Sequence, residues 1–169
     1  TGVQTCALPI LEISDLPKLA DVFYIGGTKN GALLGEAIVI CKEDLKEDFR
    51  YHIKQKGGLL AKGRLIGIQF LELFKNDLYF NLARHANFMA ETLKLGIKEC
   101  GYKFLINSST NQIFPILPNK TIEKLQENYL FFVWQKIDDD NSAVRLVTSW
   151  ATKDESVKSF IDDLKLISK

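Results

Sequence analysis

Two short apolar runs that enclose a glycine-rich segment place the strongest constraint on the fold. Residues 22–25 (VFYI) and 37–41 (AIVIC) are rich in β-branched and aromatic side chains. Runs of this length, bounded by turn residues, predict buried β-strands. The segment between them begins GGTKNG, so Lys29 directly follows the first strand. Such a lysine is expected to be held in place by the turn around it.

The stretches around these strands have helical patterns. Ser14 and Asp15 offer a capping side chain and Pro17 a first-turn proline for a short helix ending near residue 20. Charged residues 42–48 begin a solvated helix, and a second helical stretch shares one apolar face, which holds Leu59, Ile66, Phe70, Leu73 and Phe74. The longest helix is predicted over residues 78–100, with Gly101 as its left-handed cap.

The remainder of the chain predicts a compact α+β lobe. Its expected order is a strand, a helix, two strands and a final helix, over residues 111–116, 121–128, 129–137, 143–150 and 153–167. A polar turn over residues 138–142 is predicted to join two antiparallel strands, and Thr152 with Glu155 to form a capping box.

Composition argues against several classes of partner. The 22 basic and 21 acidic residues are scattered and give a net charge of +1, which disfavours a nucleic-acid surface. The longest apolar runs fall far short of the roughly 20 residues that cross a bilayer, so no membrane association is expected. The three cysteines form no metal-ligand spacing and favour free thiols in the cytoplasm.

The first ten residues, TGVQTCALPI, are similar to the translation of a common sequencing-library adapter. We interpret residues 1–10 as an artefact that replaces the true upstream part of a longer gene. The alternative is a genuine irregular N-terminus. No secretion signal is indicated, because the segment has no positive n-region.

Lys29 is the first candidate for chemistry. A lysine that forms a Schiff base needs a desolvated position, where loss of its charge is eased and the amine becomes nucleophilic. The alternative is a surface lysine in a turn between strands. A phosphate-binding loop is excluded because Thr28 precedes Lys29 and the glycine spacing is wrong, and no dinucleotide fingerprint follows either strand.

Arg145 is the second candidate, because it lies in the apolar strand sequence AVRLVT. A guanidinium can grip a carboxylate through two parallel hydrogen bonds, as in recognition of the α-carboxylate of an amino acid. An arginine on an edge strand, paired with solvent or a local aspartate, is the alternative.

Three further cations surround the glycine pair 57–58. Lys54, Lys62 and Arg64 lie near a predicted helix start, where a phosphate could be met, although such residues also solvate helix faces. His52 and His85 are isolated from other ligand types, so no metal site is predicted.

Residues 21–32, with the sequence DVFYIGGTKNGA, resemble the lysine segment of the threonine aldolase and β-eliminating lyase family. The resemblance continues through residues 59–64 (LLAKGR) and 144–150 (VRLVTSW) and spans nearly everything after residue 10. It implies a fold-type-I enzyme that uses pyridoxal 5'-phosphate, acts on an amino acid and assembles as a homodimer or homotetramer.

The resemblance assigns site residues one by one. Lys29 matches the lysine that holds the cofactor, with Thr28 beside it, and Arg145 matches the arginine that binds the substrate carboxylate. Lys54 matches a phosphate-binding lysine passably. The family also has an arginine at this site, whose position corresponds to residue 60 or 61, where this chain has no basic residue. Lys62 and Arg64 are the nearest basic residues that could replace it. The family's ring-stacking histidine, pyridine-binding aspartate and phosphate loop lie upstream of the lysine, in sequence absent here.

The predicted fold class is therefore α/β, as the C-terminal part of a fold-type-I enzyme. Residues 11–77 would end a large cofactor-binding domain, residues 78–101 would form a connecting helix, and residues 102–169 a small α+β domain. The predicted activity is cleavage of L-threonine or L-allo-threonine to glycine and acetaldehyde, with this chain alone inactive. The alternatives are a β-eliminating lyase, an aminotransferase or a non-catalytic α/β interaction module.

Overall fold

The computed structural model describes residues 13–168 of the chain, which divide into two compact units along the sequence, the first ending at Leu82 and the second beginning at Ala83. The predicted adapter artefact at residues 1–10 lies outside the described residues. Among residues 13–168, no helix combines the length and the apolar character needed to cross a membrane.

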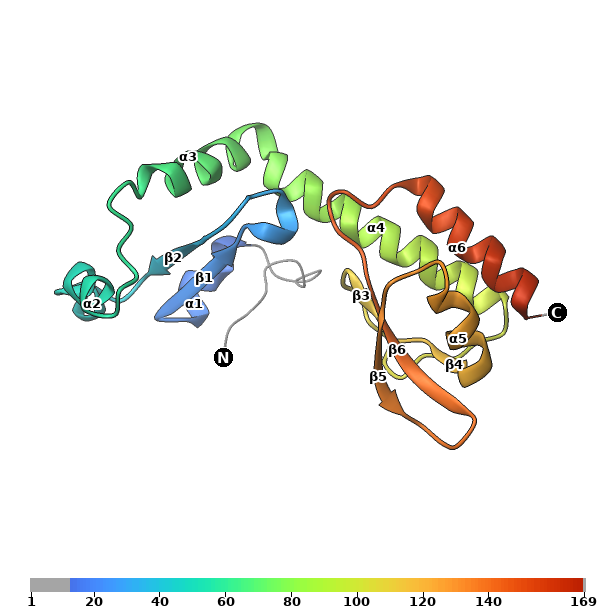
Figure 1. Cartoon of the computed structure of the whole chain (residues 1–169). Helices are drawn as coiled ribbons and strands as arrows, with labels where there is room; N and C mark the ends of the chain where they lie inside the picture. Colours follow the sequence, from blue (N-terminus) through green and yellow to red (C-terminus); the bar gives the residue numbers. More distant parts are fainter. Residues whose placement is uncertain (1–12, 169) are drawn as a thin grey trace. The chain divides into compact units, whose positions relative to one another are not determined.

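The first unit contains an antiparallel hairpin of β1 (Val22–Gly26) and β2 (Glu36–Ile40) (Figure 1). In this hairpin, Tyr24 lies opposite Ile38. The hairpin follows a 3-10 turn, η2 (Ile13–Asp15), and a short helix, α1 (Leu16–Leu19). Both strands were predicted, but their predicted burial is wrong, since Tyr24 and Ile38 are 40% and 52% exposed. The reason is that the described residues provide a two-stranded sheet whose packing buries only part of each strand, chiefly at Ile25.

Short helices complete the first unit. They are η3 (Thr28–Asn30), η4 (Glu43–Leu45), α2 (Phe49–Gln55), α3 (Arg64–Leu73) and η5 (Lys75–Asp77). Phe70 and Leu73 of α3 pack with Ile25, Ala32 and Tyr79 in a small core. The predicted apolar face is confirmed at Phe70 and Leu73, whereas Leu59 and Phe74 are exposed.

Helix α4 (Leu78–Glu99) agrees closely with the predicted long helix. It ends before Gly101, whose φ of 85° is the left-handed conformation expected of a C-terminal cap. The part of α4 that belongs to the second unit contributes Met89, Ala90, Leu93 and Ile97 to that unit's core.

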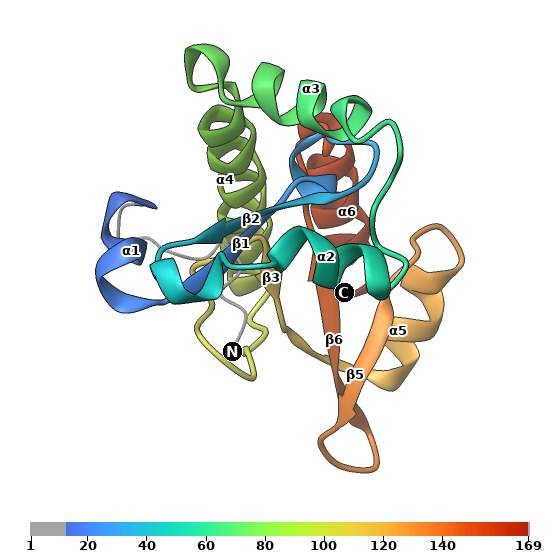
Figure 2. The same cartoon turned by 90° about the vertical axis from the view of Figure 1, so that its left-hand side faces the viewer.

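The second unit has the predicted α+β character. Its elements after α4 are β3 (Gln112–Ile113), β4 (Ile116–Pro118), α5 (Asn119–Gln126), β5 (Phe132–Lys136), β6 (Asn141–Val147) and α6 (Asp154–Ile167). All three other strands pair with β6 in antiparallel fashion, and β5 and β6 lie side by side in both views (Figures 1 and 2). Helices α4, α5 and α6 supply most of the core against Val144 and Leu146 of β6.

One predicted strand is split in two. Residues 111–116 were expected to be continuous, but β3 ends at Ile113 and β4 starts at Ile116. The interruption includes Pro115, which has no backbone N–H to donate to a ladder. Its carbonyl nevertheless accepts a hydrogen bond of 3.0 Å from the Val144 N–H, so the two short strands stay aligned on β6.

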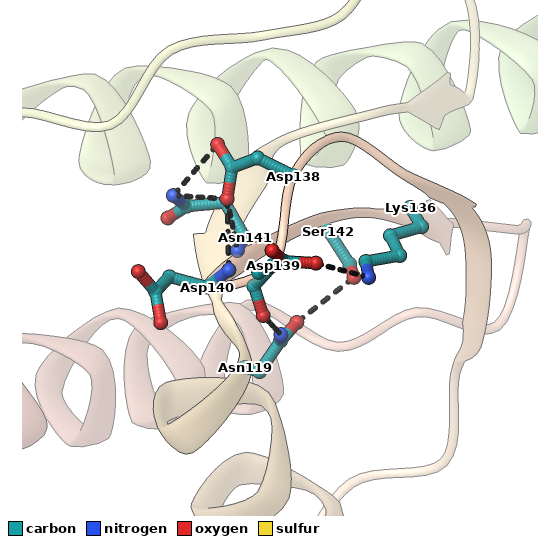
Figure 3. Close-up of polar contacts among 7 residues, drawn as sticks. All are labelled: Asn119, Lys136, Asp138, Asp139, Asp140, Asn141 and Ser142. Atoms are coloured by element: carbon teal, nitrogen blue, oxygen red, sulfur yellow. Dashed lines mark hydrogen bonds and ion pairs between the residues drawn. The ribbon is translucent and has the colours of Figure 1, made fainter.

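The polar turn between β5 and β6 is confirmed (Figure 3). The Asp138 carboxylate accepts hydrogen bonds from the backbone N–H groups of Asp140 and Asn141, at 2.9 and 2.8 Å, and from the Asn141 side-chain amide. The bond from the Asn141 side chain is the largest cause that lowers the pKa of Asp138 below its ordinary value. The turn therefore prefers the ionised carboxylate.

Both predicted N-terminal helix caps are wrong. Helix α6 begins after Lys153 without a side-chain cap, because the Thr152 hydroxyl instead accepts a hydrogen bond of 2.9 Å from the Ser149 N–H. Helix α1 also has no side-chain cap, and Asp15 forms an ion pair of 2.9 Å with Lys18. In both cases a nearby partner takes the oxygen that the sequence pattern assigned to the helix end.

Candidate functional site

The lysine segment is a tight turn at the end of β1. Thr28, Lys29 and Asn30 form one 3-10 turn, which ends at Gly31 with φ 95°. The backbone carbonyl of Gly27 accepts two hydrogen bonds across this turn, from the N–H groups of Asn30 at 3.0 Å and Ala32 at 2.9 Å. A left-handed residue is needed to close it, and glycine adopts that conformation at little cost.

Two buried side chains fasten this turn to the start of α4. The Tyr79 hydroxyl donates a hydrogen bond of 2.8 Å to the Gly26 carbonyl, and the Asn30 side-chain amide donates one of 3.4 Å to the Tyr79 carbonyl. Asn30 and Tyr79 are only 1% and 2% exposed. The backbone on both sides of Lys29 is therefore fixed. Sequence reasoning missed both residues, although an asparagine beside the candidate lysine was a signal.

Gly27 is required by close packing. A Cβ atom at this position would come within 2.7 Å of the Ala32 Cβ and 2.9 Å of the Phe70 ring. Any larger residue would push the turn away from α3.

The side chains of Lys29 and Thr28 are exposed. A desolvated position was expected for Lys29, but residues 13–168 leave it exposed to solvent. The backbone of the turn is thus fixed, whereas Lys29 itself is an exposed residue of the described part of the chain.

The three other predicted cations lie on the same unit as Lys29. Lys54 is in α2, Lys62 precedes α3 and Arg64 is the first residue of α3, and all three are exposed. Within residues 13–168, none of the three side chains forms a hydrogen bond or an ion pair with another residue. Their assignment to a phosphate stays a prediction.

Arg145 lies in the second unit, on the strand that pairs with all the others. Its position on β6, with Phe132 of β5 opposite, excludes the alternative of an edge-strand arginine. The Arg145 guanidinium carbon lies 5.4 Å from the ring centres of both Phe132 and Trp134. The Arg145 Nε is buried and has no hydrogen-bond partner among the described residues. No carboxylate of the described residues forms an ion pair with Arg145.

A cavity of about 280 Å³ opens beside Arg145. Most of its lining is apolar, and its polar groups include Arg145 and the hydroxyls of Thr148 and Ser156. A concave, largely apolar site with few polar groups is typical of small-molecule binding. The cavity and Arg145 can therefore receive a small anion that also has an apolar part.

Thr148, at the exit of β6, is a buried residue that the sequence did not indicate. Its hydroxyl donates a hydrogen bond of 2.6 Å to the Ala86 carbonyl of α4, and its own carbonyl accepts one of 2.7 Å from the Asn111 side chain. These bonds fix the end of the strand that carries Arg145.

Comparisons with known proteins found related sequences, although no family model matches the chain. It is 32% identical over 149 residues to the low specificity L-threonine aldolase of Pseudomonas aeruginosa, and 28% identical over 149 residues to that of a Pseudomonas species. Each alignment covers 87% of this chain and 42% of the relative. The chain thus spans less than half the length of these two relatives.

Solved structures give the same result. The threonine aldolase of Leishmania major matches with a TM-score of 0.95 and 40% identity, over 99% of this chain and 51% of that one. The serine palmitoyltransferase of Sphingomonas wittichii matches with a TM-score of 0.63 at 12% identity, over 87% of this chain and 39% of that one. A structure of SPT with its PLP internal aldimine matches at 0.58 with 9% identity, over 86% of this chain and 39% of that one. The last two share the fold alone.

Proposed function

Because this chain belongs to the threonine aldolase family and matches the C-terminal part of fold-type-I pyridoxal-phosphate enzymes, we propose that the whole protein cleaves L-threonine and L-allo-threonine to glycine and acetaldehyde. The observation that carries the proposal is the lysine turn, whose backbone is fixed by Tyr79 and Asn30. We further propose that the protein acts as a cytoplasmic homodimer or homotetramer.

The residues of this chain fit pyridoxal phosphate. The cofactor has an aldehyde, which an amine on a rigid turn can hold covalently, and Lys29 supplies that amine. Its phosphate requires cations, for which Lys54, Lys62 and Arg64 of the same unit are candidates, with Thr28 as a nearby hydroxyl. When bound, the cofactor supplies the electron sink for breaking the Cα–Cβ bond.

Arg145 would bind the substrate carboxylate. The buried Nε without a partner and the absence of any ion pair within the described residues leave the guanidinium available to an anionic ligand. A planar guanidinium holds a carboxylate by two parallel hydrogen bonds, which fixes the orientation of the bound amino acid. Orientation of the scissile bond is a large part of the catalytic effect in such reactions.

The test is covalent trapping. The full-length gene product is purified, supplied with pyridoxal phosphate and reduced with borohydride, which makes the lysine–cofactor link permanent, and the modified peptide is found by mass. We expect the label on Lys29 and its loss in Lys29→Ala. Lys42→Ala, which changes another exposed lysine of the same unit, should keep the label. A folded protein with an unlabelled Lys29 would contradict the proposal and favour a non-catalytic interaction module.

Product analysis separates the enzymatic alternatives. Glycine and acetaldehyde from L-threonine support the aldolase reaction. Other fold-type-I reactions share the lysine and the carboxylate-binding arginine, so a keto acid in place of glycine would indicate an aminotransferase or a β-eliminating lyase.

A further inference from the structure

Arg145 is flanked by aromatic rings where a carboxylate would usually be found. Phe132 is its direct register partner on β5, and the Trp134 ring lies at the same distance, 5.4 Å, from the guanidinium carbon. Trp134 is itself supported by Phe114, whose ring contacts it edge to face at 5.3 Å. The cation thus contacts two rings of one strand.

The register of β5 is irregular at this point. Val133 pairs with Val144 and Gln135 with Ala143, so Trp134 is an extra residue without a partner on β6. A bulge of this kind increases the local twist and redirects side chains, and bulges are frequent beside functional sites. Here the redirected side chain contacts the candidate substrate-binding cation.

Aromatic rings hold a cation differently from a carboxylate. The ring face attracts the guanidinium through its quadrupole but carries no net charge and accepts none of its N–H bonds strongly. A carboxylate partner would neutralise Arg145 and occupy its hydrogen-bonding edge. The rings can therefore fix the plane of the guanidinium while its charge and N–H groups stay available to a ligand.

We propose that Phe132 and Trp134 are positioning residues that hold the Arg145 guanidinium in the plane required to grip the substrate carboxylate at two points. This inference rests on the proposed function, because it gives Arg145 the carboxylate of an amino acid. The two residues act through Arg145 and take no part in bond breaking.

The experiment is a double-mutant cycle in the full-length protein with L-threonine as substrate. Each cation–π contact at an exposed site contributes about 0.5–1 kcal/mol, so Trp134→Leu or Phe132→Leu should raise KM about two- to fivefold. The turnover number should change little, because the rings orient the bound substrate and do not contact the reacting bond. Trp134→Phe keeps an aromatic ring, so its KM should stay close to that of the unmodified protein.

The coupling to Arg145 distinguishes a positioning role from a structural one. In an Arg145→Lys background, Trp134→Leu should raise KM no further, because the planar group that the ring orients is gone. An equal rise in both backgrounds would overturn the proposal, as would a normal KM in both ring variants.

A binding measurement and a matched control complete the test. Calorimetry with glycine should give the same two- to fivefold weakening for the ring variants, independently of turnover. Phe88→Leu is the control, since Phe88 belongs to the same unit and is 65% exposed against 66% for Phe132. It should leave glycine binding unchanged. If Arg145→Lys itself has no effect on glycine binding, the carboxylate role of Arg145 fails, whereas cofactor trapping at Lys29 tests the rest of the proposed function separately.

Discussion

Gly27 and Gly26 are neighbours at the lysine turn, but only Gly26 has space for a larger side chain. A Cβ at Gly27 would meet Ala32 and Phe70 at less than 3 Å, whereas a Cβ at Gly26 would have nothing within 4 Å. The difference arises because Gly27 is buried against α3 and Gly26 is exposed at the end of β1. Local sequence does not distinguish them.

We expect Gly27→Ala to lower the free energy of unfolding by about 1–3 kcal/mol, the usual range for overpacking. Gly26→Ala should be nearly neutral. Urea unfolding followed by circular dichroism measures both, and equal effects of the two substitutions would show that the turn does not pack as described. Gly27→Ala should also reduce borohydride labelling of Lys29, because the turn that carries the amine is displaced.

Tyr129 provides a pH-dependent test at the residue scale. Burial, followed by its hydrogen bond of 2.7 Å to the Asp163 carboxylate, raises the pKa of Tyr129 from 10.0 to about 12. The folded state therefore retains the phenol proton at a pH where the unfolded chain loses it, so the stabilisation is present below pH 10 and is lost between pH 10 and about 12.

Spectrophotometric titration of the tyrosines checks this shift. We expect a late ionisation step near pH 12 that disappears in Tyr129→Phe. The variant should also lose stability less steeply than the parent between pH 10 and about 12. Tyr51→Phe is the control, because Tyr51 is 69% exposed and its removal should leave the late step in place.

At the scale of elements, α4 and α6 approach each other closely at Gly96. A Cβ at this position would collide with three side-chain carbons of Ile161. By contrast, Gly67 within α3 is exposed, and a Cβ there would have nothing within 4 Å. The same change in two helices should therefore have opposite effects.

Gly96→Ala is expected to destabilise the protein by about 1–3 kcal/mol through overpacking. Gly67→Ala should stabilise it by about 0.5–1 kcal/mol, because alanine favours a helix interior more than glycine does. Thermal unfolding monitored by circular dichroism compares the two. A stabilising Gly96→Ala would mean that α4 and α6 are not in close contact.

The elements that the sequence predicted well are those with a long periodic pattern. Helix α4 was placed within one residue at its end, because apolar side chains recur at steps of three and four over its whole length. The two N-terminal helix caps were missed, because each depends on which of several nearby partners a polar group selects.

For the whole molecule, the described part of the first unit leaves many apolar side chains uncovered. Leu33 is 85% exposed, and Leu65, Ile68 and Leu71 of α3 are each more than half exposed. Apolar side chains exposed together in this way are typical of a surface that packs against another part of a protein.

We therefore predict that the isolated 169-residue chain binds pyridoxal phosphate weakly, produces no glycine from L-threonine and binds a hydrophobic dye strongly. The reason is that its candidate lysine is exposed and that it spans only 42% of the length of its Pseudomonas relatives. Absorbance titration with the cofactor, a glycine assay and dye fluorescence measure the three properties. Turnover by the isolated chain would refute the prediction.

Most secondary-structure elements and both candidate residues could be predicted from the amino-acid sequence. Short apolar runs predicted the first two strands, and periodicity predicted the long helix and the α+β order, because side-chain positions repeat with the geometry of each element. The string GGTKNG and the arginine within an apolar strand singled out Lys29 and Arg145 from the chemistry of their side chains.

The contacts that hold these residues in place, by contrast, are visible only in the folded chain. Tyr79 lies 53 positions from Gly26 along the chain, and Trp134 reaches Arg145 through a bulge in a strand pairing. Such contacts form between segments distant in sequence, and each depends on how a neighbouring element packs. No local pattern encodes that packing, so the supports of the candidate site became visible only in the folded chain.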